Sequence, residues 1–276
     1  MQYIFRQTTQ PFRGVTLNWL HPLTRGLVNC WLINTGAGSI LHDVTANSNH
    51  LTLMLTEPSG WSGGKMGNSF DFDGIDDYAY KSIADFRSSD SQGTISCWFR
   101  ASTTAGNTIF ASADESSTNY LFMVTISNDL MALQTKRGVG TTNILRGTEL
   151  VNDELWHNFV VTSDGSAYVF YLDGSIEGFT AGINNGEWFS SFANRDNISV
   201  GALVRTSVAG HFNGKVSNIM VWNRPLTEGE AKKLYYEPLA MFNRQSANWL
   251  WSAGVSAPPT GIASMRQIVG VGQGTR

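Results

Sequence analysis

The sequence contains little cysteine and little charge. Only two of its 276 residues are cysteines, Cys30 and Cys97, and charged residues make up 15% of the chain. Two distant cysteines allow one disulfide or two buried thiols, and the place of Cys97 in an alternating apolar stretch favours the thiols. The net charge of −3 lacks the basic excess of nucleic-acid-binding proteins, so we expect no nucleic-acid partner.

Long apolar runs are missing as well. No stretch approaches the roughly 18 apolar residues of a membrane-spanning helix, and residues 1–6 lack the basic-then-apolar layout of a secretory signal. We therefore expect a protein that is made in the cytoplasm and does not insert in a membrane. No repeat of about 20–50 residues and no alternation of strands with helices is visible, which argues against propellers, solenoids and parallel α/β sheets.

Glycine and aromatic residues are abundant, with 28 Gly, 15 Phe and 9 Trp, a mixture typical of strands joined by tight turns. Between residues 94 and 100, Ile95, Cys97 and Phe99 alternate with polar or outward-facing neighbours, which predicts a strand. Residues 157–162 and 167–172 flank a Ser-Asp-Gly-Ser turn and predict a hairpin.

A later strand and a helix complete the pattern. Val216, Met220 and Trp222 are expected on one face of a strand, opposite Ile219 and Val221, so that both faces are apolar and covered. Thr227 and Glu230 have the spacing of a capping box and predict a helix of two or three turns, which ends before Pro238.

Three regions of the chain differ in composition and in hydrophobic pattern. Residues 1–24 mix aromatic and polar residues without a sustained period, residues 25–237 are dense in strand and turn signals, and residues 238–276 carry a Pro-Pro pair and a glycine-rich end. We predict an N-terminal arm, a β-sandwich and a C-terminal arm with these boundaries.

Several stretches resemble the laminin-G-like/concanavalin A-like superfamily, in particular its pentraxin-like branch in bacteria and phages. The resemblance is carried by an ordered set of motifs, which includes Gly-Asn-Ser-Phe-Asp-Phe-Asp-Gly-Ile-Asp-Asp-Tyr at 67–78, Tyr-Leu-Asp-Gly at 171–174 and Val-Trp-Asn-Arg-Pro-Leu-Thr at 221–227. The resemblance implies an all-β, two-sheet antiparallel jelly-roll sandwich (concanavalin A-like), with loops at one rim available to a ligand. To this the residue pattern adds one short C-terminal helix and extended terminal arms.

The acidic residues Asp71, Asp73, Asp76 and Asp77 surround Gly74. Carboxylates in a tight loop are hard oxygen ligands of the kind that Ca²⁺ prefers, and related domains hold Ca²⁺ near such a loop. This points to a Ca²⁺ site made of Asp73, Asp76, Asp77 and Asn213. The alternative is a glycine turn whose Asp side chains accept hydrogen bonds from the local backbone.

Signs of catalysis are lacking. The concanavalin A-like glucanases carry a Glu-x-Asp-x-x-Glu pattern that places paired carboxylates on one strand face, and retaining hydrolysis needs such a pair. No Glu of this sequence lies in that pattern, and the Gly-x-Ser-x-Gly match at 60–64 is followed by glycines that disfavour the helix of a nucleophile elbow. We therefore expect a protein that is not an enzyme and assign no catalytic residue.

Aromatic residues in turn-rich segments are the candidates for glycan binding, because an exposed ring face stacks on a sugar. They are Trp61, Tyr120, Trp188 and Phe189. Burial in the core is the alternative for each of them.

The C-terminal segment carries apolar residues but is too short to bury them itself. Met241, Phe242, Trp249 and Trp251 are therefore expected to pack on the sandwich or on a neighbouring subunit, and arms that cross between subunits suit a homo-oligomer. The segments at 18–27 and 237–242 resemble those of phage virion proteins that carry this domain. The sequence predicts a virion structural protein (capsid decoration, head-fibre or tail-associated subunit) at the virion surface. Its expected partners are other virion proteins, with glycan adhesion as a secondary hypothesis. The alternatives are a stand-alone carbohydrate-binding lectin-like module and a glycoside hydrolase or lyase.

Overall fold

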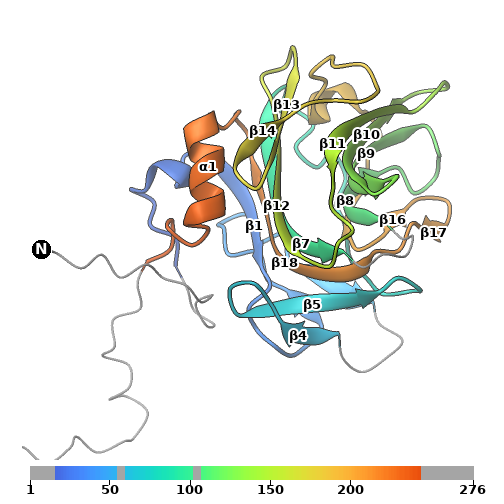
Figure 1. The fold of residues 1–276 in the computed structure, drawn as a ribbon. Helices are drawn as coiled ribbons and strands as arrows, with labels where there is room; N and C mark the ends of the chain where they lie inside the picture. Colours follow the sequence, from blue (N-terminus) through green and yellow to red (C-terminus); the bar gives the residue numbers. More distant parts are fainter. Residues whose placement is uncertain (1–15, 55–59, 102–106, 244–276) are drawn as a thin grey trace, which may run out of the picture. The chain divides into compact units, whose positions relative to one another are not determined.

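Two antiparallel sheets form the body of the chain in a computed structural model, which describes residues 16–54, 60–101 and 107–243 (Figure 1). The β18 sheet has eight strands, in the order β14 (Ser175–Glu177), β13 (Tyr168–Leu172), β12 (Trp156–Ser163), β7 (Gly93–Ala101), β18 (Asn213–Trp222), β5 (Asn68–Asp73) and β4 (Trp61–Gly63), with β1 (Leu27–Leu32) also paired to β18.

The second sheet, here called the β9 sheet, also has eight strands. Their order is β11 (Asn143–Leu150), β10 (Leu130–Arg137), β9 (Tyr120–Ser127), β8 (Thr108–Ala113), β15 (Asn197–Val200), β6 (Tyr78–Ser82), β3 (Leu51–Met54) and β2 (Ile40–Leu41). A short hairpin of β16 (Leu203–Val204) and β17 (Val208–Ala209) forms a separate two-stranded sheet, and its Leu203 packs on side chains of β8 and β9. The predicted two-sheet antiparallel sandwich is confirmed.

The main core lies between the sheets and is built by strand alternation. Ile95, Cys97 and Phe99 of β7 belong to it, and so do Phe122 and Val124 of β9. The predicted hairpin is confirmed as β12 and β13. Both cysteines are buried free thiols, as the sequence favoured, and burial raises the pKa of each.

The central strand β18 contains a bulge that the sequence did not reveal. Its register with β7 shifts between Val216 and Asn218, so the extra residue Ser217 reverses the alternation. Val216 therefore lies in the main core with Ile219 and Val221. The prediction that Val216 shares a face with Met220 and Trp222 was wrong for this reason.

A second apolar cluster covers part of the outer face of the β18 sheet. Met220, Trp222 and Trp98 point outward into this cluster, where α1 (Glu228–Tyr236) packs on them. The Tyr235 ring stacks on the Trp98 ring with centroids 5.6 Å apart. The predicted capping box at the start of α1 is present, with Thr227 as the N-cap.

The described parts of both predicted arms belong to this body. Before β1, Leu17 and Leu23 are buried in the second cluster, and a 3₁₀ turn (η1, Pro22–Thr24) brings the carbonyl of Leu23 to 2.7 Å from Trp222 Nε1. Leu17 also pairs with Phe242 in an isolated bridge. The boundaries predicted at 24 and 238 therefore fall inside the folded body, because these short segments supply part of its apolar cover.

Among the described residues, no helix combines the length and the apolar character that crossing a membrane requires.

Candidate functional site

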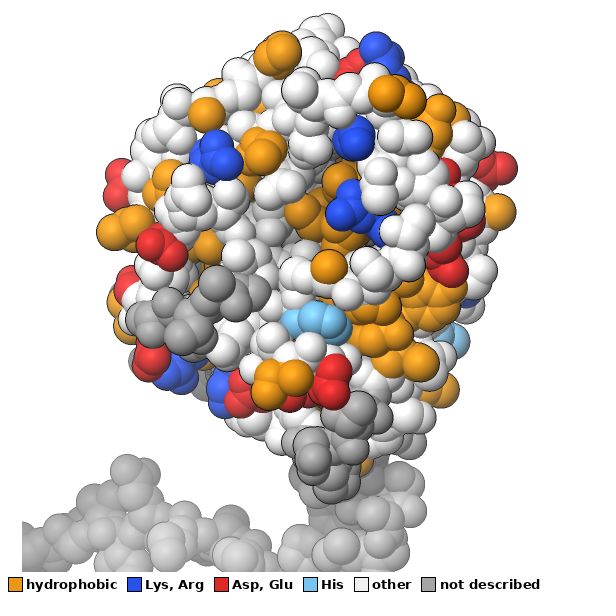
Figure 2. Space-filling view, turned by 90° about the vertical axis from the view of Figure 1, so that its right-hand side faces the viewer, with side chains coloured by type: hydrophobic (Ala, Val, Ile, Leu, Met, Phe, Trp, Pro, Cys, Tyr) orange, Lys and Arg blue, Asp and Glu red, His pale blue; other side chains and the backbone are white. Residues whose placement is uncertain are grey.

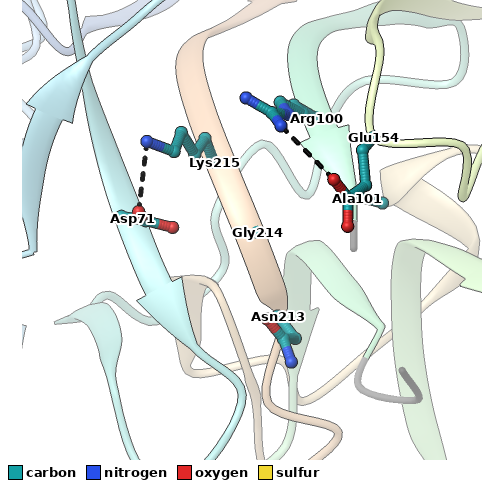
Figure 3. A pocket seen from close by; sticks show the side chains of 7 residues that line it. All are labelled: Asp71, Arg100, Ala101, Glu154, Asn213, Gly214 and Lys215. Carbon is teal, nitrogen blue, oxygen red and sulfur yellow. Dashed lines mark ion pairs between the residues drawn. The ribbon is translucent and has the colours of Figure 1, made fainter. Parts of the chain in front are cut away.

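A polar pocket of about 240 Å³ lies on the outer face of the β18 sheet, beyond the second apolar cluster (Figure 3). Three neighbouring strands, β5, β18 and β7, supply most of its lining, and the loop before β12 supplies the rest. The lining residues are Asp71, Arg100, Ala101, Glu154, Asn213, Gly214 and Lys215.

Strand register brings the charged side chains of the pocket into one row. Lys215 of β18 lies opposite Asp71 of β5 on one side and opposite Arg100 of β7 on the other. Lys215 Nζ is 3.2 Å from Asp71 Oδ2, and Arg100 Nη2 is 3.5 Å from Glu154 Oε2 (Figure 3). The row therefore runs carboxylate, cation, cation, carboxylate, and offers both donors and acceptors of hydrogen bonds to a ligand.

The loop that carries Glu154 is anchored at two points. The Glu154 amide donates to the carbonyl of Ala101 at the end of β7. His157, at the start of β12, lies 3.0 Å from Asp153 Oδ1 through Nε2 and 2.9 Å from Asp173 Oδ2 through Nδ1. A neutral imidazole has one N–H and can donate to only one of the two carboxylates. The ring donates to both at the same time only when it is protonated. Burial disfavours the charge, but the hydrogen bonds to Asp173 and Asp153 outweigh it and raise the pKa of His157.

This arrangement makes stability depend on pH. Because the folded-state pKa of His157 lies above the unfolded value of about 6.5, its contribution is complete below about pH 6.5 and is lost as the pH rises through the folded pKa. We expect the wild type to lose more stability than His157→Gln between about pH 6 and pH 9, measured by urea unfolding. If the free energy of unfolding depended on pH equally in the two proteins, the protonated state assigned to His157 would be contradicted.

An acidic loop adjoins the pocket. Oxygen atoms of Asp73, Asp76 and Asp77 all lie within 4.8 Å of one another, and this cluster could bind a metal ion. Asn213 lies opposite Asp73 in the β5–β18 register and lines the pocket. The alternative interpretation is also visible, because Asp73 Oδ1 accepts from the Ile75 amide at 2.7 Å.

The electrostatics of the loop favour a cation. Burial raises the pKa of Asp77, and the negative charges of Asp73 and Asp76 raise it further. A divalent ion placed among the three carboxylates would remove this repulsion, and oxygen ligands suit Ca²⁺.

Removing such an ion should lower stability. For Ca²⁺ at about 100 times its dissociation constant the linkage contributes about 2.7 kcal/mol, so excess EDTA should lower the melting temperature by about 5–10 °C. The matched control is Asp76→Asn, which removes one charge and should abolish the response to EDTA and Ca²⁺. An identical melting curve with EDTA and with Ca²⁺ in the wild type would contradict a structural ion.

The structure separates the four aromatic residues predicted as a glycan platform. Trp188 and Phe189 are fully buried in the main core, so the expectation of exposed rings was wrong for these two. They lie at the 3₁₀ turn η2 (Phe189–Ser191) between the sheets, where Phe122 packs on both rings. Trp61 and Tyr120 are half-buried and belong to different sheets.

The residues predicted for assembly fall into two groups. Met241 and Phe242 are buried in the second apolar cluster of the chain itself, because the segment after α1 folds back onto the β18 sheet. Packing on the sandwich, one of the two expectations for these side chains, is therefore what the structure has. Trp249 and Trp251 lie outside the described residues.

Sequence reasoning missed Arg100, Lys215 and Glu154 as site residues. One signal for Arg100 was available in the sequence. The alternation over residues 94–100 places Arg100 on the outward face of the strand, the same face as Trp98. Nothing in the sequence gave the register between strands, which places Lys215 and Asp71 beside Arg100.

The side that carries β16 and β17 faces the viewer in Figure 2. Lys and Arg side chains lie there singly among apolar and uncharged polar groups, and the described residues of this view form no continuous basic patch. This distribution agrees with the low charge of the sequence.

Comparison with protein families gives one match. Residues 73–232, more than half of the chain, match a model described as the concanavalin A-like lectin/glucanases superfamily. No curated protein matches the sequence.

Solved structures with a similar fold include carbohydrate-active proteins. Domain 4 of AbnA, a GH43 extracellular arabinanase from Geobacillus stearothermophilus, in complex with arabinotriose, is 14% identical with a TM-score of 0.56, over 76% of this chain and 98% of that one. Trypanosoma rangeli sialidase is 14% identical with a TM-score of 0.56, over 79% of this chain but 33% of the sialidase. The CBM40 of Ruminococcus gnavus IT-sialidase bound to α2,3 sialyllactose is 18% identical with a TM-score of 0.47, over 52% and 82%. At these identities the matches to the arabinanase domain and to the Trypanosoma rangeli sialidase, both with a TM-score of 0.56, show a similar fold and nothing further.

Proposed function

The chain belongs to the concanavalin A-like lectin/glucanase superfamily, and on this premise we propose that it is a carbohydrate-binding module without catalytic activity. The observation that carries the proposal is the row of hydrogen-bond donors and acceptors in the pocket formed by β5, β18 and β7. Sugar hydroxyls donate and accept, so they match a site of this kind. The complex of the arabinanase domain with arabinotriose supports the same class of ligand.

The charges in the pocket support binding rather than hydrolysis. Asp71 is paired with Lys215 and Glu154 with Arg100, whereas a catalytic pair of carboxylates faces the same reacting bond. The sequence also lacks the paired acids of the glucanases. A polysaccharide digestion assay that released product would contradict this part of the proposal.

The binding site can be tested with matched pairs of variants. Binding to an array of neutral and acidic glycans should be lost when Asp71→Ala and Lys215→Ala are combined, a change that removes an ion pair without leaving one charge alone. Arg137→Ala with Glu187→Ala removes another surface ion pair, 2.8 Å long, away from the pocket and should leave binding intact. If no glycan binds the wild type, or if both double variants bind equally well, the proposal fails.

A virion structural role is the second candidate function, as a capsid decoration, head-fibre or tail-associated subunit at the surface of a bacteriophage, made in the host cytoplasm. The described chain ends meet at one place, where the Asn243 amide donates to the Thr16 carbonyl at 3.0 Å. Trp19 and Leu20 nearby are 57% and 96% exposed. Such an end suits attachment to another virion protein or to further copies of the chain.

Native mass measurement of the full chain and of a chain ending at Asn243 tests this role. The truncation begins there because Leu239, Met241 and Phe242 belong to the folded body. An oligomer that becomes a monomer on truncation supports attachment through residues 244–276. A full chain that stays monomeric, in solution and on particles viewed by negative-stain microscopy, would contradict it.

A further inference from the structure

The pocket places two cations side by side. Lys215 and Arg100 lie directly opposite each other on the neighbouring strands β18 and β7, a position in which like charges repel. An anion bound between the two side chains would relieve that repulsion. We infer that the pocket recognises a carboxylated sugar, of the uronate or sialate class, whose carboxylate replaces Glu154 beside Arg100. This inference rests on the proposed glycan binding at the same pocket.

The two ion pairs of the pocket differ in how firmly their surroundings fix them. Asp71 lies within strand β5, and its partner Lys215 is also held by the Ser62 hydroxyl, 3.1 Å from Nζ. Glu154 comes from a loop, is 56% exposed at its side chain and lies 3.5 Å from an Arg100 that is 40% exposed. An exposed pair of this kind contributes little free energy, so an incoming carboxylate displaces Glu154 at little cost.

Arg100 is suited to that exchange. Its planar guanidinium can bind both oxygens of a carboxylate at once, a geometry stronger than a single long contact. Lys215 would add a second positive charge at the neighbouring position. The volume of about 240 Å³ lies below the range of about 300–1,000 Å³ for drug-sized ligands, so the pocket suits one sugar unit.

The role of Glu154 distinguishes an acidic ligand from a neutral one. If Glu154 competes with the ligand carboxylate, Glu154→Gln removes the competitor and strengthens binding of an acidic glycan by roughly two- to fivefold. If Glu154 instead accepts from hydroxyls of a neutral sugar, the same substitution weakens binding. Arg100→Gln should weaken binding of the acidic glycan by at least about tenfold.

Calorimetry with two matched ligand pairs tests the inference. Oligogalacturonate is compared with its methyl ester and sialyllactose with lactose, so the two arms also separate uronate from sialate. We expect the acid to bind more tightly than its neutral counterpart in at least one pair, with Glu154→Gln stronger, Arg100→Gln weaker and the surface variant Arg137→Gln unchanged. Thermal unfolding of each variant confirms that it is folded.

The outcomes separate this inference from the proposed function. Equal binding of acid and neutral ligand, or weaker binding of the acid by Glu154→Gln, overturns the carboxylate preference while glycan binding stands. If the wild type binds only neutral glycans on the array, the carboxylate preference is likewise overturned and glycan binding stands. No binding to any glycan overturns both.

Discussion

Arg195→Ala is expected to lower the free energy of unfolding by about 3–5 kcal/mol. The Arg195 side chain is buried, and burial lowers its pKa to about 10, so it stays charged at neutral pH. Its guanidinium donates to the carbonyls of Phe86, Phe189 and Phe192 and to the Ser112 hydroxyl, at 2.7–2.9 Å. Alanine would remove the guanidinium from all four buried acceptors, and an acceptor left unpaired in the interior costs free energy; the Phe189 carbonyl alone would keep a second donor, the Phe192 amide.

The position of Arg195 explains why its effect should be large. Its hydrogen bonds join β8, the segment before β7 and the turn η2, and the guanidinium also lies over the Phe189 ring at 4.8 Å. Urea unfolding gives the free energy. Arg137→Ala, which removes a side chain 62% exposed in an ion pair with Glu187, serves as the control and should cost about 0–1 kcal/mol. Similar values for both substitutions would show that the buried hydrogen bonds contribute little.

Trp188→Ala is expected to destabilise the fold by about 3–5 kcal/mol. The ring is fully buried, and its centroid lies 5.0 Å from that of Phe122 and 5.4 Å from that of Phe189. Alanine would leave a cavity between the two sheets, since the neighbouring rings and the backbone at Gly93 can fill it only in part.

The same variant separates a core role from a ligand role for Trp188. Trp188→Phe keeps most of the apolar volume and should recover most of the loss, because the indole N–H has no hydrogen-bond partner among the residues that the structure describes. Tyr236→Ala changes an aromatic residue that is 60% exposed and should have little effect on urea unfolding. A Trp188→Ala protein of wild-type stability that no longer bound glycans would restore the platform hypothesis.

Local patterns in the sequence predicted much of the fold. The alternation in β7, the turn between β12 and β13 and the capping box of α1 each depend on neighbouring residues, so they are readable from short segments. Trp188 and Phe189 lie in a segment without alternation, and their burial depends on how the chain returns between the sheets. The prediction that both rings are exposed rested on the turn-rich composition of this segment, and it was therefore wrong.

The candidate site was harder to predict because it depends on pairing between distant strands. Asp71, Arg100 and Lys215 are far apart in the sequence, and only the registers of β5, β18 and β7 make them neighbours. One inserted residue, Ser217, also changes which side of β18 faces the core. The acidic cluster was different, since Asp73, Asp76 and Asp77 are close in sequence and one tight turn brings them together.

The place of β18 in its sheet has a consequence for how the protein folds. This strand pairs with β7, β5 and β1, yet it is the last strand in the described chain. During synthesis those three earlier strands lack their common neighbour until residue 222 has left the ribosome. Closing such long loops costs entropy before any contact repays it. We therefore expect slow, late and cooperative folding, with the edges of β5 and β7 open to chaperones or aggregation until the final strand inserts.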